Sequence, residues 1–438
     1  MDIFKAYDIR GIYGEGLTDE AAEKIGKALG TFLKGKEDVC VGFDTRSSSP
    51  ILFKNFVAGL MSTGCNVISL GMIPNPVAYF CAWKNKIYGC HITASHNPEK
   101  WNGFKIFKPN GVSFTEEIKI LENIFNSEDF IEGKGKIIEK NNIIKDYKDF
   151  LKKRLGKLEG KIVVDFLGGA GLKNKETLDA FDIDIIPLHG KPDASLYGFH
   201  MLEPWGTLLN NAKKAVKKEK ADFGVAFDAD ADRSIFISSK GEYVEPSIMI
   251  GIFIKYILKR KKGNIVTTFD CASELEHFSK KLGGKHKWMR IGHNFIEKEV
   301  ALEKALFGGE ESSHYFFNEF YPFSDGILST LYLCKILKET KKSFDELIKE
   351  IKFHPVEKIY IDAKTDEKKI DVVERLRKRY HKSLDIVDGF KVKLNRIEWV
   401  LIRSSQTLPE INLCIEARNK KRLDSLAKKY SEIIRKEL

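Results

Sequence analysis

The sequence has little glutamine, no paired cysteine motif and no long apolar run. Gln406 is the only glutamine, whereas lysine, glutamate and isoleucine are abundant, a composition that gives a weak indication of heat adaptation. None of the seven cysteines forms a C-x-x-C pair, which disfavours a zinc site and favours buried reduced thiols over disulfides. No stretch reaches about 18 uninterrupted apolar residues, so no membrane span is expected.

The N-terminus and the overall charge narrow the class of protein further. Residues 1–5 (MDIFK) lack the basic-then-apolar layout of a signal peptide, so we expect a cytoplasmic protein. A composition of 43% hydrophobic and 31% charged residues is that of folded domains and excludes extensive disorder. The formal net charge of +11 suits a small phosphorylated substrate as well as nucleic acid.

Short apolar segments alternate with longer amphipathic ones, a pattern typical of α/β proteins. Four apolar segments, at 39–43, 162–166, 223–227 and 265–269, each run into a small or polar turn, and such turns at strand ends bind ligands in open α/β sheets. The last part of the chain predicts a small α+β domain, with helices at 368–381 and 420–436 around strands at 390–394, 399–403 and 411–416. A polar stretch at 126–142 is predicted to be a linker.

The segment 93–98 (TASHNP) follows an apolar-leaning stretch and ends at a proline. Its turn can expose the Ser95 hydroxyl at the end of a strand. A Ser–His hydrolase is disfavoured, because neighbours in sequence rarely face each other and the G-x-S-x-G frame is absent. An ordinary turn is the alternative, since Ser, His, Asn and Pro all favour turns.

Three aspartates alternate in residues 228–233 (DADADR), directly after a very apolar segment. They would repel one another in a tight turn unless a cation compensates, and carboxylate oxygens favour magnesium or calcium. An EF-hand is excluded, because Arg233 and Ser239 stand where that loop needs Gly and Glu. Three protein ligands would leave room for a phosphate oxygen, whereas the alternative is a solvated acidic turn.

Three further segments carry weaker signals. Residues 308–314 (GGEESSH) offer groups that can hydrogen-bond sugar hydroxyls, or they simply end a helix or strand. Residues 403–409 (RSSQTLP) combine the guanidinium, hydroxyl and turn N–H groups of a phosphate cradle, or they form a polar hairpin loop. Residues 168–171 (GGAG) lack the third glycine of the dinucleotide-binding fingerprint, which favours a plain strand–helix turn.

Taken in this order, the segments at 93–98, 228–233, 309–314 and 403–409 resemble those of the α-D-phosphohexomutase superfamily. Residues 4–11 (FKAYDIRG) are similar to the start of its phosphomannomutase/phosphoglucomutase branch. The resemblance covers nearly the whole chain. It implies an α/β protein with three related α/β domains plus a smaller C-terminal α+β domain around a central cleft. We place these at 1–140 (phosphoserine loop), 141–240 (metal loop), 241–355 (sugar loop) and 356–438 (phosphate loop).

The resemblance also implies an activity and a set of site residues. The activity is reversible phosphoryl transfer between O1 and O6 of mannose and glucose phosphates, through a phosphoserine and a hexose 1,6-bisphosphate that also serves as activator. Mg²⁺ is expected on phosphorylated Ser95 together with Asp228, Asp230 and Asp232. The expected catalytic residues are Ser95, Lys105, Arg10 and His293. The expected substrate-binding residues are Tyr7, His96, Arg233, Arg290, Gly292, Glu310, Ser312, Arg403, Ser405, Gln406 and Thr407.

Lys105 is a candidate proton acceptor, because a lysine in a cationic cleft could have a lowered pKa, but the general base of each half-reaction stays open. Magnesium and Arg233 are expected to offset the charge on the transferring group. The sequence departs from the family pattern at Ala229 and Ser313, where glycine is usual, and it has Glu311 at a variable position. These departures affect the expected choice of sugar more than the reaction.

Two other activities remain open on this sequence. A phosphoglucosamine mutase would perform the same chemistry on an amino sugar, and a metal-dependent sugar phosphatase would use the same aspartates but release phosphate. A nucleic-acid-binding module is disfavoured because no basic–aromatic array is present. We expect a monomer or small homo-oligomer that binds a phosphorylated sugar and neither nucleic acid nor membrane.

Overall fold

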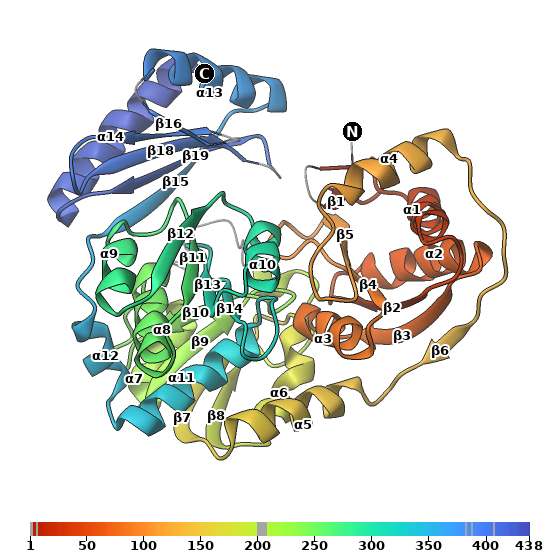
Figure 1. The fold of residues 1–438 in the computed structure, drawn as a ribbon, viewed down its shortest axis with the longest axis horizontal. Coiled ribbons are helices and arrows are strands. Elements are labelled where there is room, and N and C mark those ends of the chain that lie inside the picture. The colour runs from red at the N-terminus through yellow and green to blue at the C-terminus, as the bar shows by residue number, and fades with distance from the viewer. Residues whose placement is uncertain (1–2, 6–7, 199–207, 382, 387–388, 406–407) are drawn as a thin grey trace.

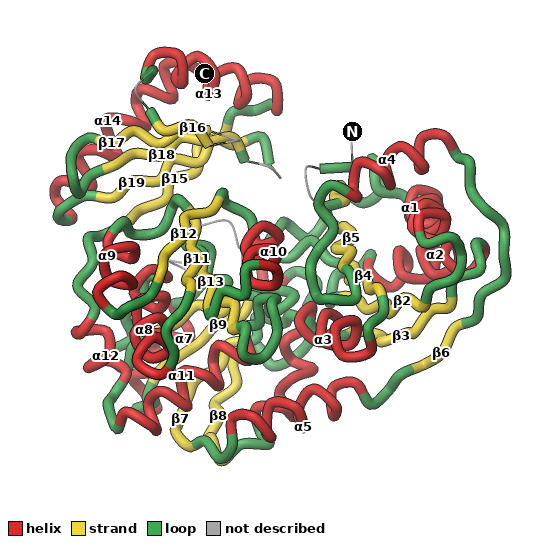
Figure 2. The backbone as a smooth tube through the Cα atoms, in the orientation of Figure 1, coloured by secondary structure: helices red, strands yellow, loops and turns green. Residues whose placement is uncertain are grey.

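The computed structural model describes residues 3–5, 8–198, 208–381, 383–386, 389–405 and 408–438, which form four β-sheets. In Figure 1 the first sheet lies at the right, the second and third at the lower left, and the C-terminal sheet above the third. Figure 2 shows helices packed around all four. Within the described ranges, the search for membrane-spanning segments finds no helix of sufficient length and apolarity.

The first sheet has the strand order β1-β5-β4-β2-β3-β6, and β5 runs antiparallel to its neighbours β1 and β4. Helices α1 and α2 pack against each other on one face and α3 lies on the other, so the central strands are buried and apolar. The bounds are β1 Ile9–Ile12, α1 Asp19–Phe32, β2 Asp38–Phe43, α2 Ser49–Ser62, β3 Asn66–Met72, α3 Asn75–Asn85, β4 Tyr88–Ile92, β5 Trp101–Phe107, α4 Glu117–Ser127 and β6 Ile137–Glu139.

The second sheet has the order β10-β9-β7-β8 and the third the order β14-β13-β11-β12. The second unit contains α5 Ile143–Leu155, β7 Glu159–Asp165, α6 Lys175–Leu178, β8 Asp182–Leu188, α7 Asn210–Glu219, β9 Phe223–Phe227 and β10 Ser234–Ile237. The third unit contains α8 Pro246–Arg260, β11 Asn264–Thr268, α9 Glu274–Lys281, β12 Lys285–Met289, α10 His293–Leu302, β13 Phe307–Gly309, β14 Tyr315–Phe317, α11 Gly326–Thr340 and α12 Phe344–Glu350.

These three units share one topology. In each, an antiparallel strand pairs with the strand that precedes it in the chain, as β5 with β4, β10 with β9 and β14 with β13. The connecting loops, at 93–100, 228–233 and 310–314, therefore leave each unit at the same topological position. Three of the chemically suggestive segments lie on these loops, which confirms the expectation of three related α/β units.

The C-terminal unit is different, because its sheet β15-β19-β18-β17-β16 is antiparallel throughout. Its elements are β15 Val356–Asp362, α13 Asp366–Arg379, β16 Leu384–Ile386, β17 Gly389–Lys393, β18 Trp399–Ser404, β19 Glu410–Glu416 and α14 Lys420–Glu437. Along β19, Ile411, Leu413 and Ile415 join the core with residues of α13 and α14. The alternate residues lie on the opposite face of the sheet.

The first unit has an apolar core of its own, to which residues of α1 and α2 contribute. One continuous apolar cluster contains residues of all three α/β units, among them Phe107, Phe227 and Phe253. The C-terminal unit has a core of its own. A small cluster joins it to the third unit, where Trp399 and Leu401 pack with Phe269.

Most of the predicted segments are confirmed. The strands expected at 39–43, 162–166, 223–227 and 265–269 are β2, β7, β9 and β11, and the C-terminal helices are α13 and α14. Several strands were not predicted, among them β15 and β6. β15 mixes charged with apolar residues, and β6 lies within 126–142, so that segment is a sixth strand of the first sheet as well as a linker.

Candidate active site

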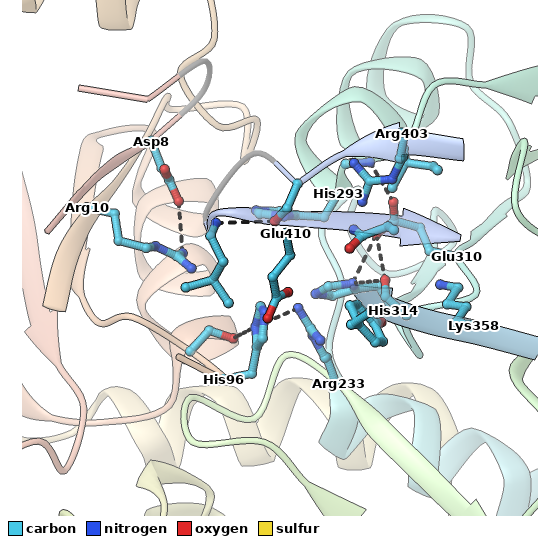
Figure 3. Close-up of a pocket in the computed structure, with 18 of the residues that line it drawn as sticks. Asp8, Arg10, His96, Arg233, His293, Glu310, His314, Lys358, Arg403 and Glu410 are labelled. Carbon is cyan, nitrogen blue, oxygen red and sulfur yellow. Dashed lines mark hydrogen bonds and ion pairs between the residues drawn. The ribbon is translucent and has the colours of Figure 1, made fainter. Parts of the chain in front are cut away.

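The described parts of all four units line one pocket, shown in Figure 3. The first unit contributes part of the 93–100 loop and residues near it, and the second contributes Arg233. The third contributes the 310–314 loop and the start of α10, and the fourth contributes one face of its sheet. The lining residues are Asp8, Arg10, Ser95, His96, Lys105, Arg233, Ile291, Gly292, His293, Glu310, Ser312, His314, Lys358, Tyr360, Arg403, Ser405, Leu408, Glu410 and Asn412.

The loop that carries Ser95 is held by a buried arginine. Arg46 donates from Nη2 to the carbonyl oxygens of Ser95 (2.7 Å) and Asn97 (2.6 Å), and from Nη1 to that of Pro98 (2.7 Å). Its Nε lies 3.1 Å from Asp44 Oδ2, so the guanidinium charge is compensated. Planar, multidentate donation of this kind fixes the loop backbone.

Ser95 itself is strained and aimed at the aspartates. Its φ is +50°, a left-handed conformation that is uncommon for a residue with a Cβ and is concentrated at functional sites. Its N–H donates to Thr93 Oγ1 at 2.8 Å, and its Oγ donates to Asp228 Oδ2 at 2.8 Å. The hydroxyl is thus fixed beside the acidic loop of the second unit.

The three aspartates are buried together, with one carboxylate oxygen of each within 4.8 Å of the other two. Lys105 Nζ donates to Asp230 Oδ2 (2.8 Å) and Asp232 Oδ2 (2.7 Å). Asp230 Oδ1 is buried and has no hydrogen-bond partner within the described chain. Clustered carboxylates with a spare buried oxygen fit a divalent cation.

The electrostatics of this cluster correct one expectation. Burial alone would lower the pKa of Lys105, but Asp230 and Asp232 outweigh it and raise that pKa above its usual range. Burial and the other two carboxylates raise the pKa of Asp228. The prediction of a lysine with a lowered pKa is therefore wrong for this arrangement, because it assumed cationic neighbours and the nearest ones are anions.

His96, Arg233 and Arg10 line the cleft together with Ser95. Arg233 Nη2 donates to His96 Nδ1 at 2.9 Å, and that nitrogen lies 3.5 Å from Ser95 Oγ. Burial and the charge of Arg233 lower the pKa of His96 well below its usual value, so the imidazole is neutral. Arg10 pairs with Asp8 at 2.8 Å and donates to Asn97 Oδ1 at 3.1 Å.

The sugar-binding candidates form a hydrogen-bonded group in the third unit. Gly292, whose φ of +134° favours glycine, donates its N–H to Glu310 Oε1 at 2.9 Å. Glu310 Oε2 lies 3.0 Å from His314 Nδ1, which also lies 2.9 Å from Ser312 Oγ. The rings of His293 and His314 stack at 5.3 Å.

The positions that depart from the family pattern are Ala229, Ser313 and Glu311, and they differ in backbone conformation and contacts. Ala229 does not take a positive φ, whereas Ala231 does (+59°). Ser313 takes a φ of +68° without the freedom of glycine. Glu311 does not line the pocket but accepts a hydrogen bond from Ser247, and burial raises its pKa to about 8.

The C-terminal phosphate-binding candidates are only partly placed. Arg403 and Ser405 line the pocket, and Ser405 donates its N–H to the carbonyl oxygen of Glu410 at 2.9 Å. The predictions for Tyr7, Gln406 and Thr407 lie outside the described residues. Arg290 is not brought together with the others. It lines a neighbouring pocket, where its guanidinium lies 3.9 Å from the centre of the Phe295 ring.

Several residues of this site were missed by the sequence reasoning. They are Asp8, Arg46, His314, Lys358, Tyr360, Glu410 and Asn412. His314 is the last residue of the 308–314 segment and could have been found there. The strand residues of the C-terminal unit carry no motif, because they reach the cleft only through the register of β15, β19 and β18.

Comparisons with known proteins agree with this fold. Family models described as phosphoglucomutase/phosphomannomutase alpha/beta/alpha domains I, II and III match residues 1–132, 142–241 and 245–353. A Thermococcus kodakarensis protein named phosphoglucomutase/phosphomannomutase is 33% identical and is covered over 97% of its length by 98% of this chain.

Two more relatives bear on function and fold. A Thermococcus gammatolerans protein named "Probable phosphoglucosamine mutase" is 32% identical, with 99% of this chain and 98% of that protein covered. The crystal structure of a phosphoglucomutase/phosphomannomutase family protein from Burkholderia thailandensis superimposes with a TM-score of 0.86 at 26% identity. That match covers 100% of this chain and 97% of the other.

Proposed function

The chain belongs to the phosphoglucomutase/phosphomannomutase family and is a phosphohexomutase, and we propose that it moves a phosphoryl group between O1 and O6 of mannose and glucose phosphates. The observation that carries the proposal is the strained Ser95, whose Oγ lies 2.8 Å from a carboxylate of the buried aspartate cluster. A hydroxyl beside a cation site, in a cleft lined by arginines, suits a phosphoryl carrier.

Phosphorylated Ser95 would transfer its phosphoryl group to the free hydroxyl of the sugar and give a hexose 1,6-bisphosphate. After the intermediate reorients in the cleft, the Ser95 Oγ accepts the other phosphoryl group. The proton released by the attacking sugar hydroxyl must pass to a base and must return in the reverse step. The same bisphosphate, added in solution, would phosphorylate Ser95 and so activate the enzyme.

Asp228, Asp230 and Asp232 would hold Mg²⁺ together with an oxygen of phosphorylated Ser95. Bound there, the ion supplies positive charge that stabilises the transferring phosphoryl group. Lys105 neutralises Asp230 and Asp232 in the present arrangement. When the cation binds, Lys105 would either move away from these two carboxylates or share them with the ion. Arg233 and Arg10 add the charges that orient the phosphoryl oxygens.

His293 is the proton acceptor that we propose. It lines the cleft at the start of α10, and burial and the charge of Lys105 lower its pKa well below the usual value, so its imidazole is neutral and can accept a proton. Lys105 is protonated between two carboxylates and suits binding better than proton abstraction. Glu310 and Ser312 would hold the sugar hydroxyls.

Arg403 and Ser405, with Gln406 and Thr407, would bind the phosphate that is not reacting. A fixed phosphate at the C-terminal end allows the sugar to present either O1 or O6 to Ser95. We propose that the protein acts on sugar phosphates as a monomer or small homo-oligomer. We propose the same division into four domains, at 1–140, 141–240, 241–355 and 356–438.

The seven free, buried cysteines fit the cytoplasm as the place of action.

A second candidate is phosphoglucosamine mutase activity, which the name of the Thermococcus gammatolerans relative favours. The deciding experiment supplies glucose, mannose and glucosamine 1-phosphates with Mg²⁺ and a hexose 1,6-bisphosphate, and it measures both 6-phosphate and free phosphate. We expect isomer formation fastest with glucose or mannose phosphate. A preference for glucosamine phosphate would favour the second candidate, and phosphate release without isomers would overturn both.

A further inference from the structure

The face of the C-terminal sheet that is turned toward the third unit carries polar side chains in cross-strand rows. Tyr360 pairs with Asn412, and Asn412 pairs with Arg403, so these three lie on one face. Lys358 lies two residues before Tyr360 and shares that face. Lys358 and Arg403 both line the cleft, and Figure 3 shows them on the same side of it.

Lys358 forms an ion pair with a buried carboxylate of the third unit. Its Nζ lies 2.8 Å from Asp270 Oδ2, and Asp270 is 3% exposed at the end of β11. Thr268 Oγ1 also donates to Asp270, at 2.6 Å. Burial would raise the pKa of Asp270, but the charge of Lys358, with a contribution from Arg403, lowers it, so both cations act on this one carboxylate.

The other side of Lys358 is open to the cleft, since 22% of its side chain is exposed. An ammonium group has three N–H donors, and Asp270 takes up one of them. Nearby, Asn412 Oδ1 is buried and finds no hydrogen-bond donor among the residues described. The remaining N–H donors of Lys358 and the unused acceptor of Asn412 suit a ligand that has both a phosphate and hydroxyl groups.

We propose that Lys358 is a further phosphate-binding residue of the cleft, held in position by Asp270. Its ammonium group contacts the same phosphate as Arg403, the one that stays in place while the other reacts. A phosphate near neutral pH carries about −1.5 to −2 charges, more than one guanidinium neutralises. This inference rests on the proposed function, because it requires a phosphorylated substrate.

Asp270 has a positioning role in this arrangement. It belongs to the third unit and Lys358 to the fourth, so their ion pair crosses between the two units. The cation that helps to hold the C-terminal unit in place is therefore the cation offered to the substrate. The competing explanation is that Lys358 only orients the C-terminal unit, and the experiment must separate the two roles.

The test compares three variants by steady-state kinetics with glucose 1-phosphate and by calorimetric binding of the same compound. Lys358→Met removes the charge, and we expect KM and Kd to rise at least about tenfold while kcat stays within about threefold. Lys358→Arg keeps the charge and should restore both constants to within about threefold. Lys364→Met, at an exposed lysine of the same unit that pairs with Asp362 outside the cleft, is the matched control and should change neither.

The double variant Lys358→Met/Asp270→Asn decides between binding and structure. It removes the cation without leaving an unpaired buried carboxylate, so the C-terminal unit keeps a neutral contact. We expect its KM and Kd to stay raised; wild-type values in this variant would overturn the inference. Absence of mutase turnover in the wild type would instead refute the proposed function, and the calorimetric comparison would still decide the role of Lys358.

Discussion

The two ends of the cleft are built in different ways. At the Ser95 end, equivalent loops of three related units converge, and one apolar cluster contains residues of all three units. At the Arg403 end, a separate antiparallel sheet with its own core rests on the third unit through a small apolar cluster and a few polar contacts. The first end places reacting atoms on rigid neighbours, whereas the second presents charges from one sheet face.

Because of this difference, the two ends of the cleft tolerate different kinds of structural change. Phosphoryl transfer requires the attacking and leaving atoms to be aligned, so small displacements at the Ser95 end reduce kcat. Holding a distant phosphate requires charge and reach, so losses at the Arg403 end raise KM. The predictions that follow disturb the two ends in turn.

Ser95→Ala has the largest expected effect. Because the variant has no oxygen to carry the phosphoryl group, mutase turnover should fall about a thousandfold or more with the fold intact. Turnover of glucose 1-phosphate and the circular dichroism spectrum measure the two outcomes. Ser127→Ala, at an exposed serine that ends α4, is the control and should behave as the wild type. Near-normal turnover in Ser95→Ala would refute the whole scheme.

Removal of divalent metal should be the next most damaging change. Without a cation, the aspartate cluster offers no positive charge to the transferring group, and we expect the rate to fall about a hundredfold or more after exhaustive chelation. Excess Mg²⁺ should restore the rate. A chelated enzyme that retains its full rate would show that the three aspartates serve another purpose.

Arg46→Lys tests how far rigidity at the Ser95 end matters. A lysine cannot donate to all the carbonyl oxygens that Arg46 holds, so the loop should loosen and kcat should fall about tenfold, with a smaller change in KM. Arg154→Lys, at an arginine that lies outside the cleft on α5, is the matched control. An effect confined to KM would contradict the role assigned to this residue.

Glu416→Gln tests the contact between the third and fourth units, with the smallest expected effect on turnover. Burial and the neighbouring Glu274 raise the pKa of Glu416 to about 9, and its carboxyl group accepts hydrogen bonds from Ser273 N and Trp399 Nε1. The raised pKa means that the protonated form stabilises the fold. This contribution is complete below the ordinary glutamate pKa of about 4.3 and is lost as the pH rises through about 9.

The variant stays neutral at every pH, so its stability should depend less on pH than that of the wild type. Between pH 6 and pH 9 we expect urea denaturation to show the variant gaining about 4 kcal/mol relative to the wild type. Glu432→Gln, at an exposed glutamate of α14, is the control. Parallel stability curves for Glu416→Gln and the wild type would contradict the raised pKa.

The comparison of the two ends also explains what the sequence could predict. The residues at the Ser95 end lie in short segments, such as 93–98 and 228–233, whose residue types indicate their chemistry. At the other end, Lys358 and Asn412 are strand residues whose role depends on cross-strand register, which a single sequence does not reveal. The pKa of Lys105 was mispredicted for a similar reason, since its partners come from another unit.

The central claim is that Ser95 carries the phosphoryl group, and the most direct test is to locate that group on the chain. The protein is incubated with Mg²⁺ and a hexose 1,6-bisphosphate, digested, and mapped by mass spectrometry. The account predicts one added phosphoryl group on the peptide that contains Ser95, removed again by incubation with hexose monophosphate. Stable phosphorylation at another residue, or none in an enzyme that turns over, would contradict it.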